Sequence, residues 1–313
     1  CIALTGGQAG ILTDSNFGNA NILAVDPGAV LRYLKEEKVA VVAGFQGVTE
    51  RGDITTLGRG GSDTTAAALG VALGAEVIEI YTDVDGVKTA DPGLVPDART
   101  IEVMTYDEVS QMAHEGAKVI HPRAVEIAMR KNVPIRVKST FKDGPGTLIT
   151  YSFETAQPWP AIKNGRPVTG VTHIGKVAQE KIRVPDSADK GFNLRVFSSL
   201  ARVGISVDMI NVSPELICFI VNEDVAEKAL LTLRGLSVEA EMLRDLAKVS
   251  VVGAGMRGLP GVMAAVVEAL DRAGVEILQT SDSHVTISCL VKGENLAASV
   301  RALHDQFGLS RGE

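Results

Sequence analysis

The chain contains the stretch Leu57-Gly-Arg-Gly-Gly-Ser-Asp-Thr-Thr-Ala-Ala-Ala68, which places a cation, two adjacent glycines, a hydroxyl and a carboxylate at the start of an alanine-rich helix. Backbone N–H groups at a helix N-terminus lack partners within the helix, and the helix dipole attracts negative charge there. Glycine lets the backbone approach a ligand closely, and Arg59 adds a planar fork that suits a carboxylate or a phosphate. The stretch therefore predicts an anion-binding site.

A plainer interpretation of the same stretch is a well-capped surface helix. Ser62 or Asp63 is able to cap the helix, and Gly74 is suited to end it. Capping requires only one of these side chains and does not account for Arg59 or the Gly60-Gly61 pair. We therefore favour the anion site.

The sequence around this helix predicts an α/β fold. The apolar runs Val39–Phe45 and Val77–Tyr81 are predicted buried strands on either side of the helix, and Pro134–Lys138 is a further strand. Strands that alternate with helices are typical of a parallel sheet with helices on its faces. We expect the helix to connect two strands of one such sheet.

Two further helices are predicted from their end signals. Thr105–Glu108 forms a capping box that opens a helix ending near Gly116. Pro122 suits the first position of the next helix, and Asn132 suits its end. Between them lies Lys118, which is either an exposed lysine, the commoner case, or a phosphate ligand. His121 is expected to cap a helix rather than to transfer protons.

The second half of the chain contains an internal repeat after a linker at residues 151–168. Cys218–Ala226 is echoed by Cys289–Ala297, and each copy is predicted to run strand, helix, strand, strand, helix. This is the order of a ferredoxin-like unit. The two cysteines then occupy matching core positions and are not metal ligands.

One segment of the second copy imitates a dinucleotide-binding motif. Gly253–Gly258 has the spacing G-x-G-x-x-G and follows a predicted strand. Too few residues follow it to complete a dinucleotide-binding sheet, and Pro260-Gly261 interrupts the start of the next helix. We therefore reject a dinucleotide-dependent enzyme, and expect no NADH binding.

Composition excludes several classes of function. The chain has 313 residues, of which 45% are hydrophobic and 22% charged, and its formal net charge is −7. Nucleic-acid binding has no electrostatic support at this charge. No apolar run reaches the length of a membrane span, and no basic stretch suggests a membrane surface. Three isolated cysteines fit a reducing cytoplasm and show no metal-site spacing.

Two segments next to predicted strands are candidate binding loops. In Tyr81–Pro92, Thr82 and Asp83 follow a strand directly, where they are placed to meet a ribose, a base or a metal-bound phosphate. The alternative is a turn rich in Asp and Gly; Gly86 stands too early for a calcium loop. Ser281–His284 lies between two predicted strands, either as a simple hairpin turn or as part of an effector pocket.

Taken together, these stretches resemble the aspartate kinase family over nearly the whole chain. Leu57–Ala67 looks like its aspartate-binding loop, Tyr81–Pro92 and Gly116–Pro122 look like its nucleotide-binding segments, and Val249–Val262 looks like the start of a second ACT domain. Val275–His284 is most similar to the diaminopimelate-sensitive, Bacillus-type members. The implied activity is phosphoryl transfer from ATP to the β-carboxylate of L-aspartate, the first step of the lysine, threonine, methionine and diaminopimelate pathway.

The resemblance also implies a domain plan. Residues 1–150 would be part of an amino-acid-kinase sandwich built on a parallel sheet, and residues 151–168 a linker. ACT modules at residues 169–245 and 246–313 would follow and bind lysine, threonine or diaminopimelate. ACT modules usually pair across a subunit boundary, so a homodimer is implied. ATP and Mg²⁺ would be the cofactors.

Site residues follow from the same resemblance. Aspartate would be bound by Phe45, Arg59, Gly60, Gly61 and Ser62, and catalysis would rest on Arg59, Asp63 and Lys118. ATP would be bound by Ser62, Thr82, Asp83, Lys88, Thr89, Ala90, Asp91, Pro92, Gly93 and Lys118. The effector would be bound by Ser206, Val207, Asp208, Asn211, Glu276, Ile277, Ser283 and His284, with the first four facing the last four. No residue is assigned to a resident metal.

Two departures from the family pattern bear on activity. Many relatives have arginine where this chain has Gly93, so that contact with the nucleotide would be lost or supplied elsewhere. The glycine-rich Lys-Phe/Tyr-Gly-Gly loop that binds ATP phosphate, and the glutamate that binds the substrate amine, would precede Cys1. The chain is therefore expected to be a piece of the enzyme. A non-catalytic amino-acid-sensing subunit is the alternative.

Without that lysine loop, the 313-residue chain alone should show little or no kinase turnover, because fewer cations offset the repulsion between two anionic substrates. A coupled assay of ADP release tests this expectation. Ordinary turnover by the isolated chain would contradict it.

Overall fold

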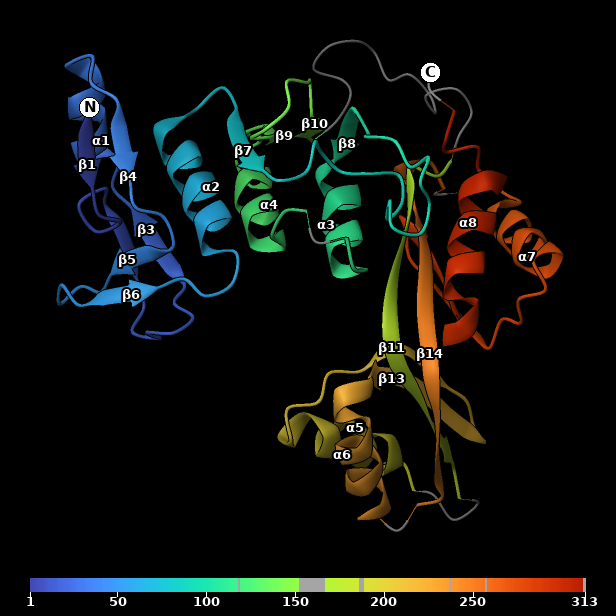
Figure 1. Ribbon diagram of the computed structural model, residues 1–313. Helices are drawn as coiled ribbons and strands as arrows, with labels where there is room; N and C mark the ends of the chain where they lie inside the picture. The colour runs from blue at the N-terminus through green and yellow to red at the C-terminus, as the bar shows by residue number, and fades with distance from the viewer. Residues whose placement is uncertain (118, 152–166, 186–188, 237, 257, 312–313) are drawn as a thin grey trace. The chain divides into compact units, whose positions relative to one another are not determined.

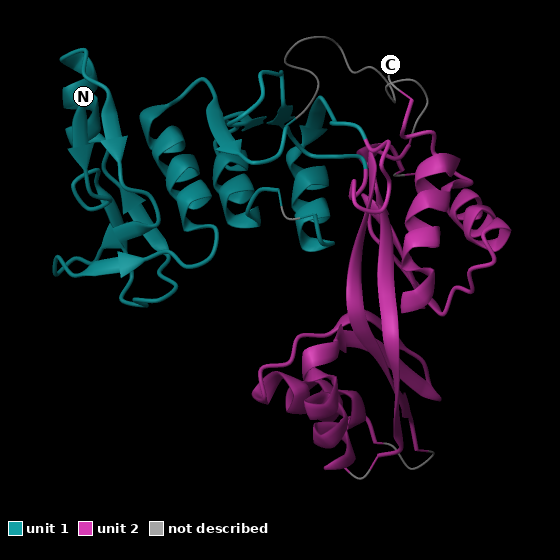
Figure 2. Ribbon diagram, viewed as in Figure 1, with its two compact units in different colours: residues 1–89, 99–165 teal, residues 90–98, 166–313 magenta. Residues whose placement is uncertain are grey.

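The computed structural model describes residues 1–117, 119–151, 167–185, 189–236, 238–256 and 258–311. The chain separates into two compact units, which Figures 1 and 2 show. The first comprises residues 1–89 and 99–165, and the second comprises residues 90–98 and 166–313. No described helix is both long and apolar enough to cross a bilayer. The linker predicted at residues 151–168 lies mostly outside the described residues.

The first unit is a mixed α/β body. Its strands are β1 (Ile2–Leu4), β2 (Ile11–Thr13), β3 (Ile22–Val25), β4 (Ala40–Val42), β5 (Gln46–Val48), β6 (Ile54–Thr56), β7 (Ile78–Thr82), β8 (Val103–Thr105), β9 (Ile135–Ser139) and β10 (Thr147–Thr150). Its helices are α1 (Gly28–Lys35), α2 (Gly61–Leu73), α3 (Tyr106–His114) and α4 (Pro122–Met129). The described strands form sheets ordered β1-β4, β3-β2-β5-β6 and β7-β9-β10-β8.

Helix α2 begins differently from the prediction. Its N-cap is Gly60, in the left-handed conformation with φ +70°, and no side chain caps it, so neither Ser62 nor Asp63 is the cap. Both residues lie in the first turn instead. Its end at Gly74, with φ +64°, is the predicted glycine stop. The N-terminus is therefore shaped by glycine backbone geometry rather than by a capping side chain.

The predicted single parallel sheet around α2 is only partly present. Among the described strands, β4 pairs in parallel with β1 and β7 pairs in parallel with β9, but β4 and β7 do not pair with each other. The strand predicted over Val39–Phe45 is shorter, and Val41 is 56% exposed rather than buried. Phe45, at the end of the predicted strand, takes a left-handed conformation with φ +72°, which is not a strand conformation.

Helices α3 and α4 follow their predicted end signals. The Thr105 side chain accepts from Glu108 N while the Glu108 side chain accepts from Thr105 N, which is the expected capping box. Pro122 is the first residue of α4, and His121 is its N-cap, as expected. Helix α4 packs against α2 on one side and against α3 on the other (Figure 1).

The second unit contains the internal repeat predicted from the sequence. Its strands are β11 (Gly170–Arg183), β12 (Asp208–Val212), β13 (Leu216–Asn222), β14 (Ala240–Val252), β15 (Gln279–Asp282) and β16 (Thr286–Lys292). Its helices are α5 (Phe192–Arg202), α6 (Glu223–Arg234), α7 (Val262–Arg272) and α8 (Leu296–Gln306), with short 3-10 turns at Ala254–Met256 and Gly293–Asn295. The six strands form one sheet in the order β12-β13-β11-β14-β16-β15.

The long strands β11 and β14 run through both modules (Figure 1). Residues 177–182 of β11 pair with the start of β14 in the first module, whereas residues 170–175 pair with its end in the second. The boundary expected between residues 245 and 246 therefore falls inside a continuous strand. Residues 170–175, expected to open the first module, instead complete the sheet of the second.

Each module has its own apolar core on one sheet face. The first packs Phe192, Val196, Leu200 and the buried side of α6 against Ile182, Ile217 and Phe219. The second packs α7 and α8 against Val249, Val251 and Cys289. Burial raises the pKa of the Cys289 thiol to about 11, as expected for an inert core cysteine. Its counterpart Cys218 is only partly buried.

One carboxyl group is buried in the first module. Glu180 is 0% exposed, and neither of its carboxylate oxygens has a hydrogen-bond partner among the described residues. Burial raises the pKa of Glu180 to about 7, Arg244 and Arg234 oppose that rise, and Glu227 adds to it. The folded chain therefore retains a proton that the unfolded chain, with a pKa near 4.5, has already lost at neutral pH.

We expect Glu180 to make the second unit less stable as the pH rises from about 4.5 to about 7, by roughly 3 kcal/mol. Glu180→Gln should remove this loss, giving a variant more stable than the wild type at pH 8 and similar to it at pH 5. Urea unfolding across this pH range measures the effect, with the exposed Glu241→Gln as the matched control. Parallel pH profiles for wild type and Glu180→Gln would contradict the assignment.

Candidate functional site

A pocket opens at the N-terminus of α2, within the first unit. It has a volume of about 410 Å³. Its lining residues are Arg59, Gly60, Asp63, Ala113, Val119, Ile120, His121 and Pro122. Arg59, Gly60 and Asp63, which are predicted for the aspartate site or for catalysis, thus lie beside the predicted nucleotide-binding segment 116–122. The pocket combines one exposed cation with an uncapped helix N-terminus, which suits a carboxylate or phosphate ligand.

Close packing between α2 and α4 fixes this pocket. A Cβ atom on Gly60 would overlap the ring of His121, and Gly60 also has positive φ, so only glycine fits there. Asp63 Oδ2 accepts a hydrogen bond from His121 N at 3.2 Å. His121 Nδ1 accepts from Arg123 N, which caps α4. Asp63 therefore holds the predicted nucleotide segment in place through His121.

Phe45 stands against the same helix start, on the loop after β4. The residue is 42% exposed, and a Cβ atom on Gly61 would overlap its ring. The left-handed backbone of Phe45 is a strained conformation for an aromatic residue. The site therefore carries strain that neighbouring contacts must balance.

Thr65 supplies the most direct of those contacts. Its hydroxyl accepts from Phe45 N at 3.0 Å and donates to Gly61 O at 2.8 Å. Thr65 is buried, in the second turn of α2. Sequence reasoning did not single out this residue. A threonine in the second turn of a helix is common. No pattern in the neighbouring sequence indicates that its hydroxyl accepts a hydrogen bond from Phe45 N.

Arg123 is a second residue that sequence reasoning missed. Its guanidinium donates to Leu57 O at 3.1 Å and Ala20 O at 3.2 Å, and to the side chains of Asn19 and Asn21. These bonds tie the start of α4 to the loop that precedes Arg59. Its distant partners could not be read from the sequence around Pro122.

The predicted nucleotide segment begins at the end of β7, as expected. Thr82 Oγ1 donates to Asp83 Oδ1 at 3.0 Å, and Asp83 is exposed. Lys88 Nζ contacts Asp85 Oδ1 at 2.8 Å and Thr100 Oγ1 at 2.9 Å. The Lys88 ammonium is thus paired with the side chains of Asp85 and Thr100.

The remaining residues of the predicted nucleotide segment differ in their exposure to solvent. Thr89 and Ala90 are buried, and Ala90 packs in the apolar core of the second unit, so their side chains do not offer a surface to a nucleotide. Asp91, Pro92 and Gly93 are exposed, and Asp91 Oδ1 accepts from Gly93 N at 2.8 Å. Lys118 lies outside the described residues.

In the second unit, a cavity of about 450 Å³ lies beside the β15–β16 hairpin. It is lined by residues of the second module alone, including Ser283, His284 and the segment before α7. Ser283 closes the hairpin by donating from its backbone N to Thr286 O. Residues 281–284 therefore form the predicted hairpin turn and also border a cavity.

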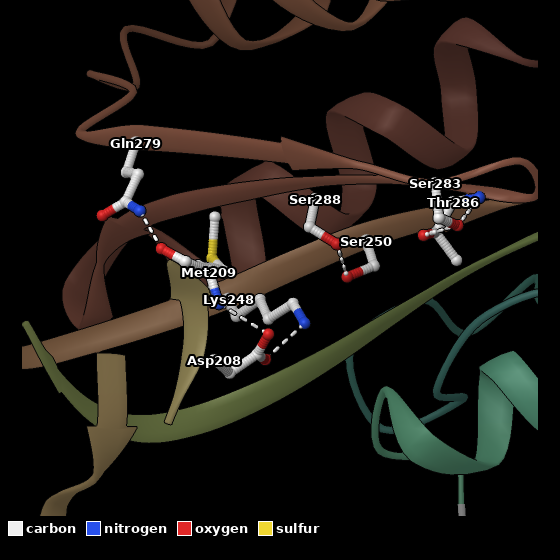
Figure 3. A network of polar contacts seen from close by, with 8 residues as sticks. All are labelled: Asp208, Met209, Lys248, Ser250, Gln279, Ser283, Thr286 and Ser288. Atoms are coloured by element: carbon white, nitrogen blue, oxygen red, sulfur yellow. Dashed lines mark hydrogen bonds and ion pairs between the residues drawn. The ribbon is translucent and has the colours of Figure 1, made fainter. Parts of the chain in front are cut away.

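The predicted effector residues of the two modules do not line one common cavity among the described residues. Val207 packs with the first core and Ile277 with the second. None of Ser206, Val207, Asp208 and Asn211 lines the hairpin cavity, and neither does Glu276. Asp208 contacts Lys248 of the second module instead (Figure 3).

The motif Gly253–Gly258 does not open a helix. The turn Ala254–Met256 and the stretch before Gly261 separate β14 from α7, in agreement with its rejection as a dinucleotide site. No group of three or more His, Cys, Asp or Glu side chains suited to a metal occurs among the described residues.

Comparison with known proteins identifies the chain. The amino acid kinase family matches residues 3–139, and ACT domains match residues 188–235 and 241–305. Aspartokinase 1 of Bacillus subtilis is 45% identical over 99% of this chain and 76% of its own length. The chain belongs to the aspartokinase family. The aspartokinase of Mycolicibacterium smegmatis is 43% identical over 98% of the chain and 75% of its own length.

Solved structures agree with this assignment. The aspartate kinase of Clostridium acetobutylicum has the same fold, with a TM-score of 0.84 at 24% identity over 97% of this chain and 70% of its own. E. coli aspartokinase III in complex with aspartate and ADP superposes with a TM-score of 0.76 at 28% identity, over 97% of this chain and 69% of its own. Family membership makes this protein an aspartate kinase, which uses ATP and carries ACT domains.

Thr65→Val should impair the kinase, because it leaves the Phe45 N–H without its acceptor at a strained position. We expect kcat/KM for aspartate to fall about tenfold, since an unsatisfied buried donor costs ~1–3 kcal/mol. Steady-state kinetics of the full-length enzyme measure this.

Two further variants separate positioning from simple destabilisation. Thr65→Ser should retain activity because it keeps the hydroxyl. Thr64→Val is the matched control, since Thr64 makes the same backbone bond to Gly60 O but none to Phe45. Equal losses in Thr64→Val and Thr65→Val would contradict a positioning role.

Proposed function

We propose that the pocket at the start of α2 binds L-aspartate, with Arg59 as its carboxylate ligand. The supporting observation is the exposed Arg59 beside a helix N-terminus that no side chain caps. A planar guanidinium pairs with a carboxylate through two parallel hydrogen bonds, and the helix start adds favourable dipoles. Gly60 lines this pocket, and Phe45, Gly61 and Ser62, at the same helix start but outside its lining, would complete the aspartate site.

Phosphoryl transfer here requires little acid–base chemistry. A β-carboxylate with an ordinary pKa of about 3.9 is already ionised at neutral pH, so no general base is needed. The obstacle is repulsion between this anion and the γ-phosphate of ATP. At ~4 Å and an effective dielectric constant near 20, each pair of like charges costs about 4 kcal/mol. The product would be 4-phospho-L-aspartate.

Residues that offset this repulsion therefore carry the catalysis in our proposal. Arg59 would hold one carboxylate, and Ser62 would stand near the transferred phosphoryl group. Lys118 would pair with phosphate oxygens, and Asp63 would keep the 116–122 segment in place through its bond to His121 N. Such preorganised charges stabilise phosphoryl transfer without reorganising during the reaction.

The nucleotide would bind along the loop after β7, at the carboxyl end of a strand of a parallel pair. Thr82, Asp83 and exposed residues 91–93 would contact it. Mg²⁺ is usually held by one or two carboxylates together with substrate phosphates, so the exposed Asp83 suits such a site without a dedicated metal cluster. When bound with ATP, Mg²⁺ would neutralise charge on the phosphates.

Regulation is proposed to occur at the ACT modules, through an amino acid of the diaminopimelate, lysine or threonine class. The cavity beside Ser283 and His284 is large enough for such a molecule. The E. coli aspartokinase III structure with lysine and aspartate supplies the analogy for amino-acid binding. Ser206, Val207, Asp208, Asn211, Glu276 and Ile277 remain candidates for a site shared between subunits.

A homodimer through the ACT modules is part of this proposal. Strand β12 is an open edge of the described sheet, and it exposes Ile210 and Val212. Such an edge is a ready surface for pairing with another chain. We also propose a cytoplasmic location, because free thiols such as Cys218 and Cys289 persist in a reducing compartment.

A non-catalytic amino-acid-sensing subunit is less well supported than a kinase. A chain of that kind would need the ACT modules alone, whereas the amino acid kinase match extends over residues 3–139. The pocket at Arg59 would also have no role in such a chain.

Arg59→Lys should raise KM for aspartate and lower kcat/KM roughly 10- to 100-fold, because lysine keeps the charge but loses the bidentate geometry, worth ~1.5–3 kcal/mol. KM for ATP should change little. Steady-state kinetics on the full-length enzyme measure both constants.

Arg51→Lys provides the control for this substitution, since Arg51 is also exposed and belongs to the turn between β5 and β6. It should leave both constants unchanged. An unaltered KM for aspartate in Arg59→Lys would refute the proposed role of Arg59.

A further inference from the structure

Residues 90–98 belong to the second compact unit, although the chain on both sides of them belongs to the first (Figure 2). The two ends of this segment are joined in the first unit, where Thr89 N donates to Arg99 O at 2.9 Å and Arg99 N donates to Thr89 Oγ1 at 3.1 Å. The segment is therefore a loop that begins and ends in the first unit and packs in the second.

Apolar contacts hold this loop in the second ACT module. Two of its side chains, Ala90 and Val95, are 3% and 2% exposed and belong to the apolar core of that module. Leu94 and Ala98 pack against the same core, which also contains Val300 of α8. Removal of these apolar side chains from water stabilises the docked loop. The loop is therefore anchored by the ACT module.

A polar contact joins the same loop to helix α8. Arg301, an exposed residue of α8, donates from its Nε to Leu94 O at 3.0 Å. Leu94 N in turn donates to Asp91 O at 3.0 Å, and Gly93 N donates to Asp91 Oδ1 at 2.8 Å. The guanidinium thus holds a tight turn in which Asp91, Pro92 and Gly93 are the exposed residues.

Those three exposed residues are the ones that we propose to contact the nucleotide. Gly93 has no side chain, so any contact that it makes comes from its backbone, and Leu94 follows it directly. A hydrogen bond from a guanidinium is stronger than one between neutral groups, and the planar fork gives it a fixed direction. The bond from Arg301 to Leu94 O therefore fixes the backbone beside the nucleotide contacts.

We propose that Arg301 is a positioning residue for ATP, through which the second ACT module holds residues 91–93 in the place where they meet the nucleotide. This inference rests on the proposed nucleotide contacts of residues 91–93. The proposed aspartate pocket at Arg59 is lined by residues of the first unit and by none of residues 90–98. Arg301 therefore affects the binding of ATP and not that of aspartate.

Arg301→Met tests the proposal, because methionine keeps an unbranched stem on α8 but cannot donate to Leu94 O. Loss of this charge-assisted hydrogen bond at an exposed position should raise KM for ATP about fivefold and leave KM for aspartate unchanged. Arg301→Lys, which keeps a charged donor without the planar fork, should show a smaller rise. Steady-state kinetics of the full-length enzyme, with each substrate varied in turn, measure these constants.

Arg272→Met is the matched control. Arg272 is an exposed arginine of the same module, and its Nε also donates to a backbone carbonyl, Glu268 O at 3.4 Å, but within its own helix α7. This variant should leave both KM values unchanged.

Asp91→Ala separates this inference from the proposed nucleotide role of the loop, because it changes one of the contacts itself and should raise KM for ATP. If Asp91→Ala raised KM for ATP while Arg301→Met left it unchanged or raised both KM values equally, the positioning role would be overturned and the nucleotide contacts would stand. If neither variant altered KM for ATP, both proposals would fall.

Discussion

The reaction of this family brings together two anions, and in our proposal their binding depends on the uncapped N-terminus of α2. Gly60 and Gly61 bring the backbone against His121 and Phe45 so closely that side chains there would overlap both rings. Arg59 stands at the same point without an internal ion pair among the described residues. The site is therefore made by close packing rather than by a catalytic triad or a metal cluster.

That packing requires support from distant parts of the first unit. Thr65 holds the strained Phe45 backbone, Asp63 holds His121, and Arg123 ties α4 to the loop before Arg59. Each contact joins residues far apart in the chain. We therefore expect the shape of the pocket to change with substitutions at residues that do not contact a ligand. Thr65 and Thr64 differ in this respect, because Thr65 bonds to Phe45 N and Thr64 does not.

The sequence predicted the parts of the structure that depend on local chemistry. The Thr105–Glu108 capping box, the proline start of α4 and the glycine end of α2 all occur where their residue types indicated.

The wrong predictions concern features of the structure that tertiary packing decides. Gly60 caps α2 in place of Ser62 or Asp63, Val39–Phe45 is mostly not a strand, and β4 and β7 do not share a sheet among the described residues. The internal repeat indicated two modules, but could not show that β11 and β14 belong to both. Because these strands are shared, Lys248 of one module reaches Asp208 of the other, a contact that no sequence spacing suggests.

The most direct measurement is a crystal structure of the full-length enzyme with aspartate and a non-hydrolysable ATP analogue. The account predicts a carboxylate of aspartate paired with the Arg59 guanidinium at the start of α2, and nucleotide phosphates facing the same pocket. Aspartate and nucleotide bound elsewhere, with the cleft between Arg59 and His121 empty, would contradict it.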